Sequence, residues 1–223
     1  TAEVYDPQTD GWQPLAKMGT ARYAFGLAAV GGKIYAIGGS SGSLGMESVE
    51  AYDPQLDSWA QVASMSVKRW CHASVELDGK IYSMGGVDGT WNILDTVEAY
   101  DPQADSWQRV ASMPRDLHLH AAAAMGGKIY VTAGANVNNY SYAYNYTDVY
   151  DPQTDAWTEL ASMGIARSKH ASAVVDGKLY VFGGCSQAGG FIDTAEVYDP
   201  ATESWAEGPK LTSARESLVA VAL

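Results

Sequence analysis

Residues 177–205 read GKLYVFGGCSQAGGFIDTAEVYDPATESW, and this stretch decides the fold. A short aliphatic and aromatic run ends at Gly183-Gly184. A variable stretch follows, and a second run ends at Tyr198-Asp199-Pro200, with Trp205 seven positions after the tyrosine. Aliphatic, β-branched and aromatic residues between turn formers are typical of short β-strands. No segment of the chain has the period of an amphipathic helix. The stretch therefore predicts strands joined by tight turns.

The same phrase recurs along the whole chain. Its tyrosines are Tyr5, Tyr52, Tyr100, Tyr150 and Tyr198, at spacings of 47, 48, 50 and 48 residues. The tryptophans that follow them are Trp12, Trp59, Trp107, Trp157 and Trp205. A Gly-Lys-aliphatic-Tyr phrase precedes each of the last four tyrosines of the series. Four short strands per repeat, without helices, predict the blades of an all-β propeller.

We name the four expected strands of each repeat A to D in chain order. Strand A is small and apolar, strand B carries the Lys-aliphatic-Tyr phrase, strand C ends at Tyr-Asp-Pro and strand D carries the Trp. We expect a single domain over residues 1–223. Its four complete blades would lie at about 20–64, 66–112, 115–162 and 165–210.

The two ends of the chain predict a partial blade. Residues 1–18 would supply strands C and D, and residues 213–223 would supply a strand A over Glu216–Leu223. The total is one strand short of five blades. The chain is therefore expected to be either a shortened five-bladed ring or part of a six-bladed one.

Charge and cysteine content narrow the function classes. The chain has 26 acidic and 14 basic residues and a formal charge of −12. This balance argues against non-specific nucleic-acid binding and against adhesion to anionic membranes. No apolar run is long enough for a membrane span, and no signal peptide is recognisable. The two cysteines, Cys71 and Cys185, do not form a disulfide framework, so we expect a cytoplasmic protein.

The double glycine after an aliphatic strand, followed by the Tyr and the Trp in four full copies, closely resembles the Kelch repeat. The resemblance covers essentially the whole chain. It implies a Kelch-type β-propeller of five to seven blades, with strand A innermost, that serves as a non-catalytic protein-interaction module. It also implies a link to substrate receptors of cullin-type ubiquitin ligases, although the BTB domain of those receptors has no counterpart in this sequence.

A recurring arginine lies eleven positions before the Lys of strand B. It occurs at Arg22, Arg69 and Arg167, and the repeat register adds Arg215. The third blade has Leu117 there, with Arg115 close by. Guanidinium groups around the mouth of the propeller would suit an acidic peptide, since each binds a carboxylate with two hydrogen bonds. Alternatively, the arginines brace loops by donating to backbone carbonyls. Both interpretations stay open.

Variable positions beside this column are further candidates for partner binding. The residues that follow the arginines include Tyr23, Trp70 and Ser168. The second B–C loop adds Asp88 and Trp91. The third is the longest and has the Tyr, Ser and Asn composition of binding loops, with Asn136, Tyr140, Tyr142 and Tyr144 as candidates. The alternative for this loop is a lid packed on its own blade.

Catalytic and metal sites are not expected. The chain has no GxSxG, HExxH or Walker pattern, so we assign no catalytic residues and no cofactor. His72, His120 and His170 share one column of the inner strands. Three histidines suit a metal in principle, but inner strands of adjacent blades are separated and no carboxylate shares the column. We therefore expect no metal.

Three functions remain open. The first is a non-catalytic module that binds an acidic peptide or loop over the mouth. The second is a carbohydrate-binding or carbohydrate-modifying propeller, in which the Tyr/Asn loop and exposed Trp residues stack on sugar rings. The third is a repeat-array scaffold that self-associates through its incomplete blade edges.

Overall fold

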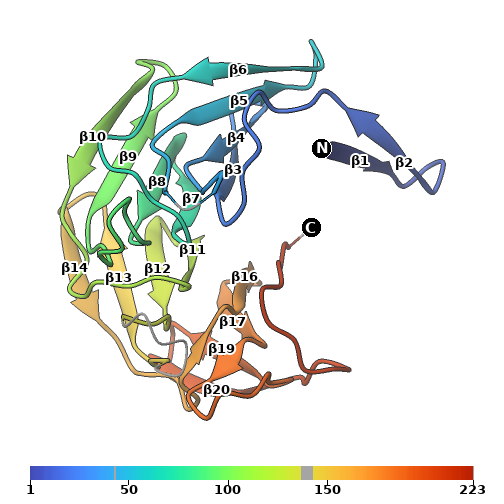
Figure 1. The fold of residues 1–223 in the computed structure, drawn as a ribbon. Coiled ribbons are helices and arrows are strands. Elements are labelled where there is room, and N and C mark those ends of the chain that lie inside the picture. The colour runs from blue at the N-terminus through green and yellow to red at the C-terminus, as the bar shows by residue number, and fades with distance from the viewer. Residues whose placement is uncertain (43, 137–142, 223) are drawn as a thin grey trace.

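The computed structural model describes residues 1–42, 44–136 and 143–222. These residues form twenty strands and no helix. Four antiparallel sheets of four strands each stand around a common axis (Figure 1). The all-β fold of four-stranded blades predicted from the repeats is confirmed. No helix that could cross a membrane occurs among the described residues.

The strands of each blade follow chain order from the axis outward. Blade one contains β3 (Gly26–Val30), β4 (Lys33–Ile37), β5 (Val49–Asp53) and β6 (Ser58–Val62). Blade two contains β7 (Ala73–Leu77), β8 (Lys80–Met84), β9 (Val97–Asp101) and β10 (Ser106–Val110). Blade three contains β11 (Ala121–Met125), β12 (Lys128–Thr132), β13 (Thr147–Asp151) and β14 (Ala156–Glu159). Blade four contains β16 (Ala171–Val175), β17 (Lys178–Phe182), β19 (Ala195–Asp199) and β20 (Ser204–Gly208).

Two small sheets complete the structure. The hairpin of β1 (Ala2–Asp6) and β2 (Gly11–Leu15) precedes blade one. A two-residue pair, β15 (Arg167–Ser168) and β18 (Cys185–Ser186), lies at the entrance to blade four.

Glycines at the end of strand B let the next blade approach closely. Gly38 and Gly39 have positive φ angles of 57° and 88°. A Cβ atom on Gly38 would lie 2.6 Å from the carbonyl oxygen of Arg69 in the next blade. No side chain fits in that space, and positive φ also favours glycine. The Gly-Gly pair is therefore required by blade packing.

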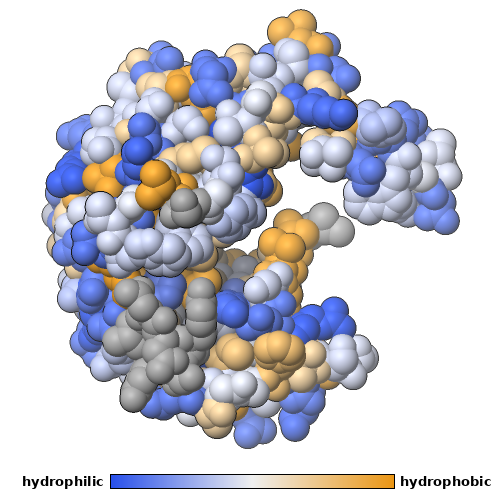
Figure 2. All heavy atoms as spheres, viewed as in Figure 1, coloured by the Kyte–Doolittle hydropathy of each residue, from blue (hydrophilic) through white to orange (hydrophobic). Residues whose placement is uncertain are grey.

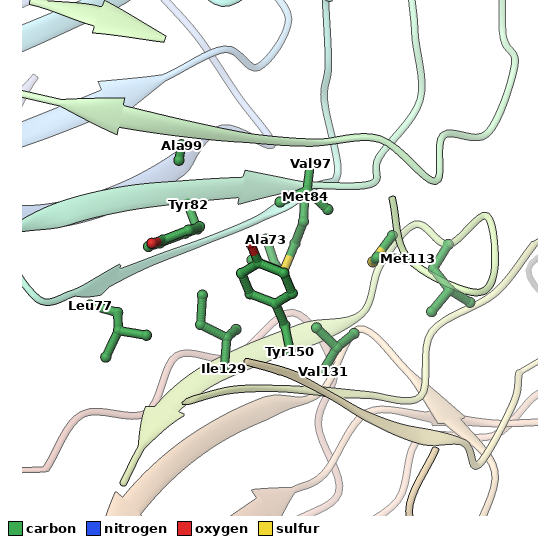
Figure 3. Packing of buried hydrophobic residues seen from close by; sticks show 11 residues of the cluster. Ala73, Leu77, Tyr82, Met84, Val97, Ala99, Met113, Ile129, Val131 and Tyr150 are labelled. Atoms are coloured by element: carbon green, nitrogen blue, oxygen red, sulfur yellow. The ribbon is translucent and has the colours of Figure 1, made fainter. Parts of the chain in front are cut away.

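The hydrophobic core lies between adjacent blades. Figure 3 shows the ring of Tyr150 beside Met84, Ile129 and Val131, which come from blades two and three. The repeated tyrosines Tyr52, Tyr100 and Tyr150 bury their rings and donate their hydroxyls to Asp57, Asp105 and Asp155 at 2.7 to 2.9 Å.

The repeated tryptophans join each blade to the preceding one. The indole N–H groups of Trp59, Trp107, Trp157 and Trp205 donate to the carbonyls of Ala16, Ala63, Ala111 and Ala161 at 2.8 to 2.9 Å. In the first three joints the backbone N–H of the same alanine donates to Asp57, Asp105 or Asp155. Each of these three joints therefore fixes both backbone polar groups of one alanine residue.

The predicted strand A over Glu216–Leu223 is wrong for the described residues, which carry no strand after Gly208. A strand needs a hydrogen-bonded neighbour, and the hairpin β1–β2 lies apart from this segment across an open gap (Figure 1). Val219 is 96% exposed and Val221 is 81% exposed. Figure 2 shows apolar residues of the C-terminal segment at this opening. The ring of blades is therefore open in this structure.

Candidate interaction surface at the propeller mouth

The mouth is edged by a belt of backbone hydrogen bonds that runs from blade to blade. Its members hold positive φ angles of 50° to 56°, and they are Ala24, Cys71, Leu119, Lys169 and Ser217. The N–H group of each later member donates to the carbonyl of the preceding one at 2.8 to 2.9 Å. The belt fixes the spacing of the D–A loops that open on this face.

A cavity of about 400 Å³ opens at the belt. Its wall combines the belt residues with the aromatic side chains of Tyr23, Phe25 and Trp70 and with three histidines. Burial raises the pKa of the Cys71 thiol to about 11, so this cysteine is protonated at neutral pH and is a poor nucleophile. The cavity therefore offers aromatic contact area and no activated thiol.

Three side chains form what we term the aromatic patch, Tyr23, Trp70 and Trp91. The ring centroids of Tyr23 and Trp70 are 6.4 Å apart at an interplanar angle of 76°. Those of Trp70 and Trp91 are 5.2 Å apart at 85°. Tyr23 is 51% exposed and Trp91 is 52% exposed. The structure thus brings together three candidates that the sequence placed in different loops.

The loop that carries Trp91 is held by Asp88. The Asp88 carboxylate accepts hydrogen bonds from the backbone N–H and side-chain groups of Thr90 and Asn92 at 2.7 to 3.0 Å. Burial opposes ionisation, but these hydrogen bonds lower the pKa of Asp88 below its ordinary value. Trp91 has a φ angle of 69°, which is rare for a bulky residue. Asp88 therefore positions the patch and is not itself a free contact group.

The expected ring of accessible arginines is wrong. Arg22, Arg69 and Arg167 have fully buried side chains, and each donates to two backbone carbonyls of its own blade. Each also pairs with a buried carboxylate. The pairs are Arg22–Glu50 at 2.6 Å, Arg69–Glu98 at 2.9 Å and Arg167–Glu196 at 2.7 Å. The bracing alternative describes these residues.

The third blade makes the equivalent pair with a different arginine. Leu117 occupies the repeat position of the arginines and is buried. Arg115 instead forms an ion pair with Asp148, which lies at the strand position of Glu50 and Glu98. Burial raises the pKa of Asp148, although the hydrogen bonds from Arg115 oppose that shift. The guanidinium also lies 4.0 Å from the ring centre of Tyr146.

The remaining candidates do not join the aromatic patch. Ser168 is fully buried in β15. Arg215 is exposed and donates to Ser213 at 2.6 Å. Tyr144 donates to Asn136 and stacks on Tyr146, so these described residues of the third B–C loop contact one another. Tyr140 and Tyr142 lie outside the described residues.

The histidine column is part of the packing between blades. His72, His120 and His170 are buried, and His170 bonds the Thr132 hydroxyl at 2.9 Å. A Cβ atom on Gly85 would lie 2.7 Å from the His120 ring. Burial lowers the pKa of His120 and of His170 to about 3, and that of His72 well below its ordinary value. The described residues contain no group of three ligands arranged for a metal ion.

Comparison with known proteins identifies the repeat. The Kelch motif matches residues 21–66, 69–114, 117–164 and 166–212. This chain belongs to the Kelch-motif family. The Kelch resemblance predicted from the Gly-Gly, Tyr and Trp columns is thereby confirmed.

Curated relatives of this Kelch chain match it over single repeats. The influenza virus NS1A-binding protein homolog of Mus musculus is 50% identical over 42 residues, which are 19% of this chain and 6% of that protein. Kelch-like protein 7 of Homo sapiens is 46% identical over 50 residues, which are 22% of this chain and 8% of that protein.

A solved structure, "Structure of YjhT", superposes with a TM-score of 0.83 and covers 95% of this Kelch chain and 77% of its own. At 16% identity it shows a shared fold.

One set of residues escaped the sequence analysis. The carboxylate partners of the arginines, Glu50, Glu98, Asp148 and Glu196, all lie two positions before the Tyr of Tyr-Asp-Pro. An acidic residue at that place in every repeat was the available signal. In three blades this acidic residue pairs with the column arginine of its own blade, and in blade three it pairs with Arg115.

Proposed function

We propose that this Kelch chain is a protein-interaction module that holds a peptide or loop of its partner over the mouth. The aromatic patch is the main anchor. Kelch propellers are a protein-interaction fold, and the chain carries the Kelch motif in four repeats. The proposal includes no catalytic step.

The observation that carries the proposal is the exposure of the aromatic patch beside a cavity. Tryptophan and tyrosine are the residues most often found at the energetic centre of protein interfaces. Here they lie on a face that the rigid blades position, and the wall of the 400 Å³ cavity begins at Tyr23 and Trp70. A partner side chain can therefore contact the rings and enter the mouth at once.

Arg22, Arg69 and Arg167, which the sequence offered as binding groups for an acidic peptide, are not part of the proposed binding surface. The guanidinium groups of Arg22, Arg69 and Arg167 are buried and already paired with carboxylates. Exposing one of them would leave a buried glutamate without its partner, which is unfavourable. Aromatic contacts, in contrast, need no rearrangement of the blades.

A peptide library tests the proposal. A phage-displayed random library is selected on the wild-type chain, and the selected peptides are measured against Trp91→Ala and Tyr23→Ala. We expect each substitution to weaken binding by about 2 kcal/mol, the magnitude typical of an interface hot spot. Trp12→Ala is the matched control, because Trp12 is 67% exposed on the hairpin before blade one. Peptides that bind both patch variants as well as the wild type would contradict the proposal.

The wider role rests on the same surface. In a longer protein, we propose, the module would serve as the substrate receptor of a ubiquitin ligase, as the Kelch resemblance implies. The curated relatives match this chain over less than a tenth of their own length. A cytoplasmic setting likewise stays a prediction. Co-precipitation of a cullin-type ligase with the full-length protein would test this role, and the absence of the ligase would contradict it.

Carbohydrate binding is the second candidate, because exposed aromatic rings also stack on sugars. Sugar recognition needs polar groups beside the rings as well. The polar side chains of Asp88, Thr90 and Asn92, which flank Trp91 in the chain, are engaged with one another at 2.7 to 3.0 Å. Specific signals on a glycan array that depend on Trp91 would favour this candidate over peptide binding.

A further inference from the structure

We propose that the group bound by the aromatic patch is a cationic side chain of the partner, a lysine, an arginine or a methylated ammonium. This inference rests on the proposed function and deepens it by naming the chemistry of the anchor. It reverses the acidic partner expected from the sequence.

The first support is the arrangement of the rings. Trp70 stands nearly perpendicular to both Tyr23 and Trp91, at 76° and 85°. Aromatic faces carry negative electrostatic potential, and a cation over the face of a tryptophan or tyrosine is attracted to it. An ammonium group in the corner between two nearly perpendicular rings contacts both of them, whereas a single flat ring offers it one face.

The second support is that the fold holds the rings in place before a ligand arrives. The hydroxyl of Tyr23 donates to the carbonyl of Gly42 at 2.5 Å, which anchors that ring to the first B–C loop. Gly45 leaves space for Trp70, since a Cβ atom there would lie 3.2 Å from its indole. Trp91 is held in a strained backbone conformation by the Asp88 loop. Strained backbone of this kind persists only where the surrounding structure fixes it, and it is concentrated at ligand-binding and active sites.

The third support is the charge around the patch. The nearby lysines already have carboxylate partners, with Lys68 3.8 Å from Glu47 and Lys169 2.9 Å from Glu216. Asp88 adds a negative charge that its hydrogen bonds keep ionised. Glu47, Asp88 and Glu216 thus outnumber the two lysines, and the whole chain has a formal charge of −12. This field attracts a cation and repels a carboxylate.

A pair of small probes separates charge from shape. Choline carries a quaternary ammonium group, and 3,3-dimethylbutan-1-ol has the same shape with carbon in place of the charged nitrogen. Each is titrated into the ¹⁵N-labelled chain at constant ionic strength while the indole Nε1–H resonances are followed by NMR. We expect choline to shift the Trp91 resonance and to bind roughly tenfold more tightly than the neutral alcohol.

Variants locate the response. Trp91→Ala should weaken choline binding roughly tenfold, and Trp91→Phe should weaken it less, because phenylalanine keeps a smaller aromatic face. Trp12→Ala should leave it unchanged. Trp91 is half exposed, so its replacement should leave the fold intact, and a thermal melt of each variant checks this.

The outcomes distinguish this inference from the proposed function. Equal affinity for choline and the neutral alcohol would overturn the cationic anchor. The cationic anchor would also be overturned if library peptides needed Trp91 but retained their affinity when every Lys and Arg in them was replaced by norleucine or citrulline. In that case the proposed function, peptide binding at the mouth, would still be supported. Choline binding that depends on Trp91, without any peptide binding, would support the cation site and contradict the proposed function.

Discussion

At the scale of single residues, each buried arginine joins three parts of its blade. The Arg69 guanidinium donates to the carbonyls of Gly85 and Thr96 at 2.8 and 3.1 Å and to Glu98 at 2.9 Å. These partners lie at the end of β8, before β9 and within β9. The glutamate in turn accepts from the backbone of the D–A loop, at 2.8 Å from Ser66. One ion pair therefore ties a loop to two strands.

Removing this arginine should strongly destabilise the fold. Arg69→Ala leaves Glu98 buried without its cation, and we expect a loss of about 3 to 5 kcal/mol in the free energy of unfolding. Urea unfolding measures it, with the exposed Arg109→Ala as control at no more than about 0.5 kcal/mol. The double variant Arg69→Met/Glu98→Leu should recover much of the loss. A loss below about 1 kcal/mol for Arg69→Ala would contradict the bracing role.

The buried histidines should make stability depend on pH. Burial lowers the pKa of His120 and His170 to about 3, so below pH 6.5 the unfolded chain binds protons that the folded chain does not. The contribution of these histidines to the free energy of unfolding should therefore be fully present above pH 6.5. It should fall as the pH drops toward 3, by about 1.4 kcal/mol per pH unit for each such histidine.

A matched variant isolates this effect. His120→Phe places a phenylalanine at the position in blade three that Phe25 occupies in blade one. The new side chain should therefore pack between the blades, and it does not titrate. Urea unfolding between pH 7.5 and 5, above the range of the carboxylates, should show a smaller slope for this variant than for the wild type. Identical slopes would show that His120 does not carry the pH dependence.

At the scale of elements, the C–D turn is both the end of one hairpin and the joint to the preceding blade. Asp105 accepts from the Tyr100 hydroxyl within its own blade and from the Ala63 N–H of the blade before, at 2.7 and 2.9 Å. Its φ angle is 46°, which an aspartate tolerates better than most residues. The turn therefore couples the register of a hairpin to the spacing of two blades.

Replacing Asp105 tests this coupling. Asp105→Ala removes both bonds, and we expect a loss of about 2 kcal/mol in the free energy of unfolding. Glu203 stands at the same place in blade four, and among the described residues the Ala161 N–H has no carboxylate partner. Glu203→Ala is therefore the control and should change stability by no more than about 0.5 kcal/mol. Equal losses at the two positions would rule out the joint as the cause.

The strands and their turns were predictable because each is determined by residues close together in the sequence. Gly-Gly, Tyr-Asp-Pro and the Trp recur in register, and each is required locally. The direction of the arginine side chains was not predictable in the same way, since it depends on an acidic residue about 28 positions later in the chain, as in Arg22 and Glu50. The aromatic patch was predicted residue by residue, but its assembly from three loops required the structure.

At the scale of the whole molecule, the ring has two unpaired ends. Glu3 and Arg215 occupy the repeat positions that form an ion pair in three of the four complete blades, and both are exposed. Trp12 and Val219 are exposed as well, where their counterparts pack between blades. Unpaired strand edges and exposed apolar residues favour association.

The 223-residue chain should therefore associate in solution as its concentration rises. Light-scattering mass after size exclusion should increase from the 23.8 kDa of one chain. Trp12→Asp and Val219→Asp should restore the mass of a single chain, because each places a charge on an edge that would have to be buried. Leu56→Asp, at an exposed residue of a C–D turn away from both ends, is the control. A constant single-chain mass for the wild type would contradict this prediction.

The belt of backbone hydrogen bonds around the mouth has an electrical consequence. Its peptide dipoles follow one another around the axis from Ala24 to Ser217, whereas the dipoles of an α-helix add along its axis and place partial charge at its ends. A circulating arrangement has almost no component along the axis, so the belt places no fixed pole on the axis of the mouth. The choice between cations and anions is thereby left to the side chains at the rim.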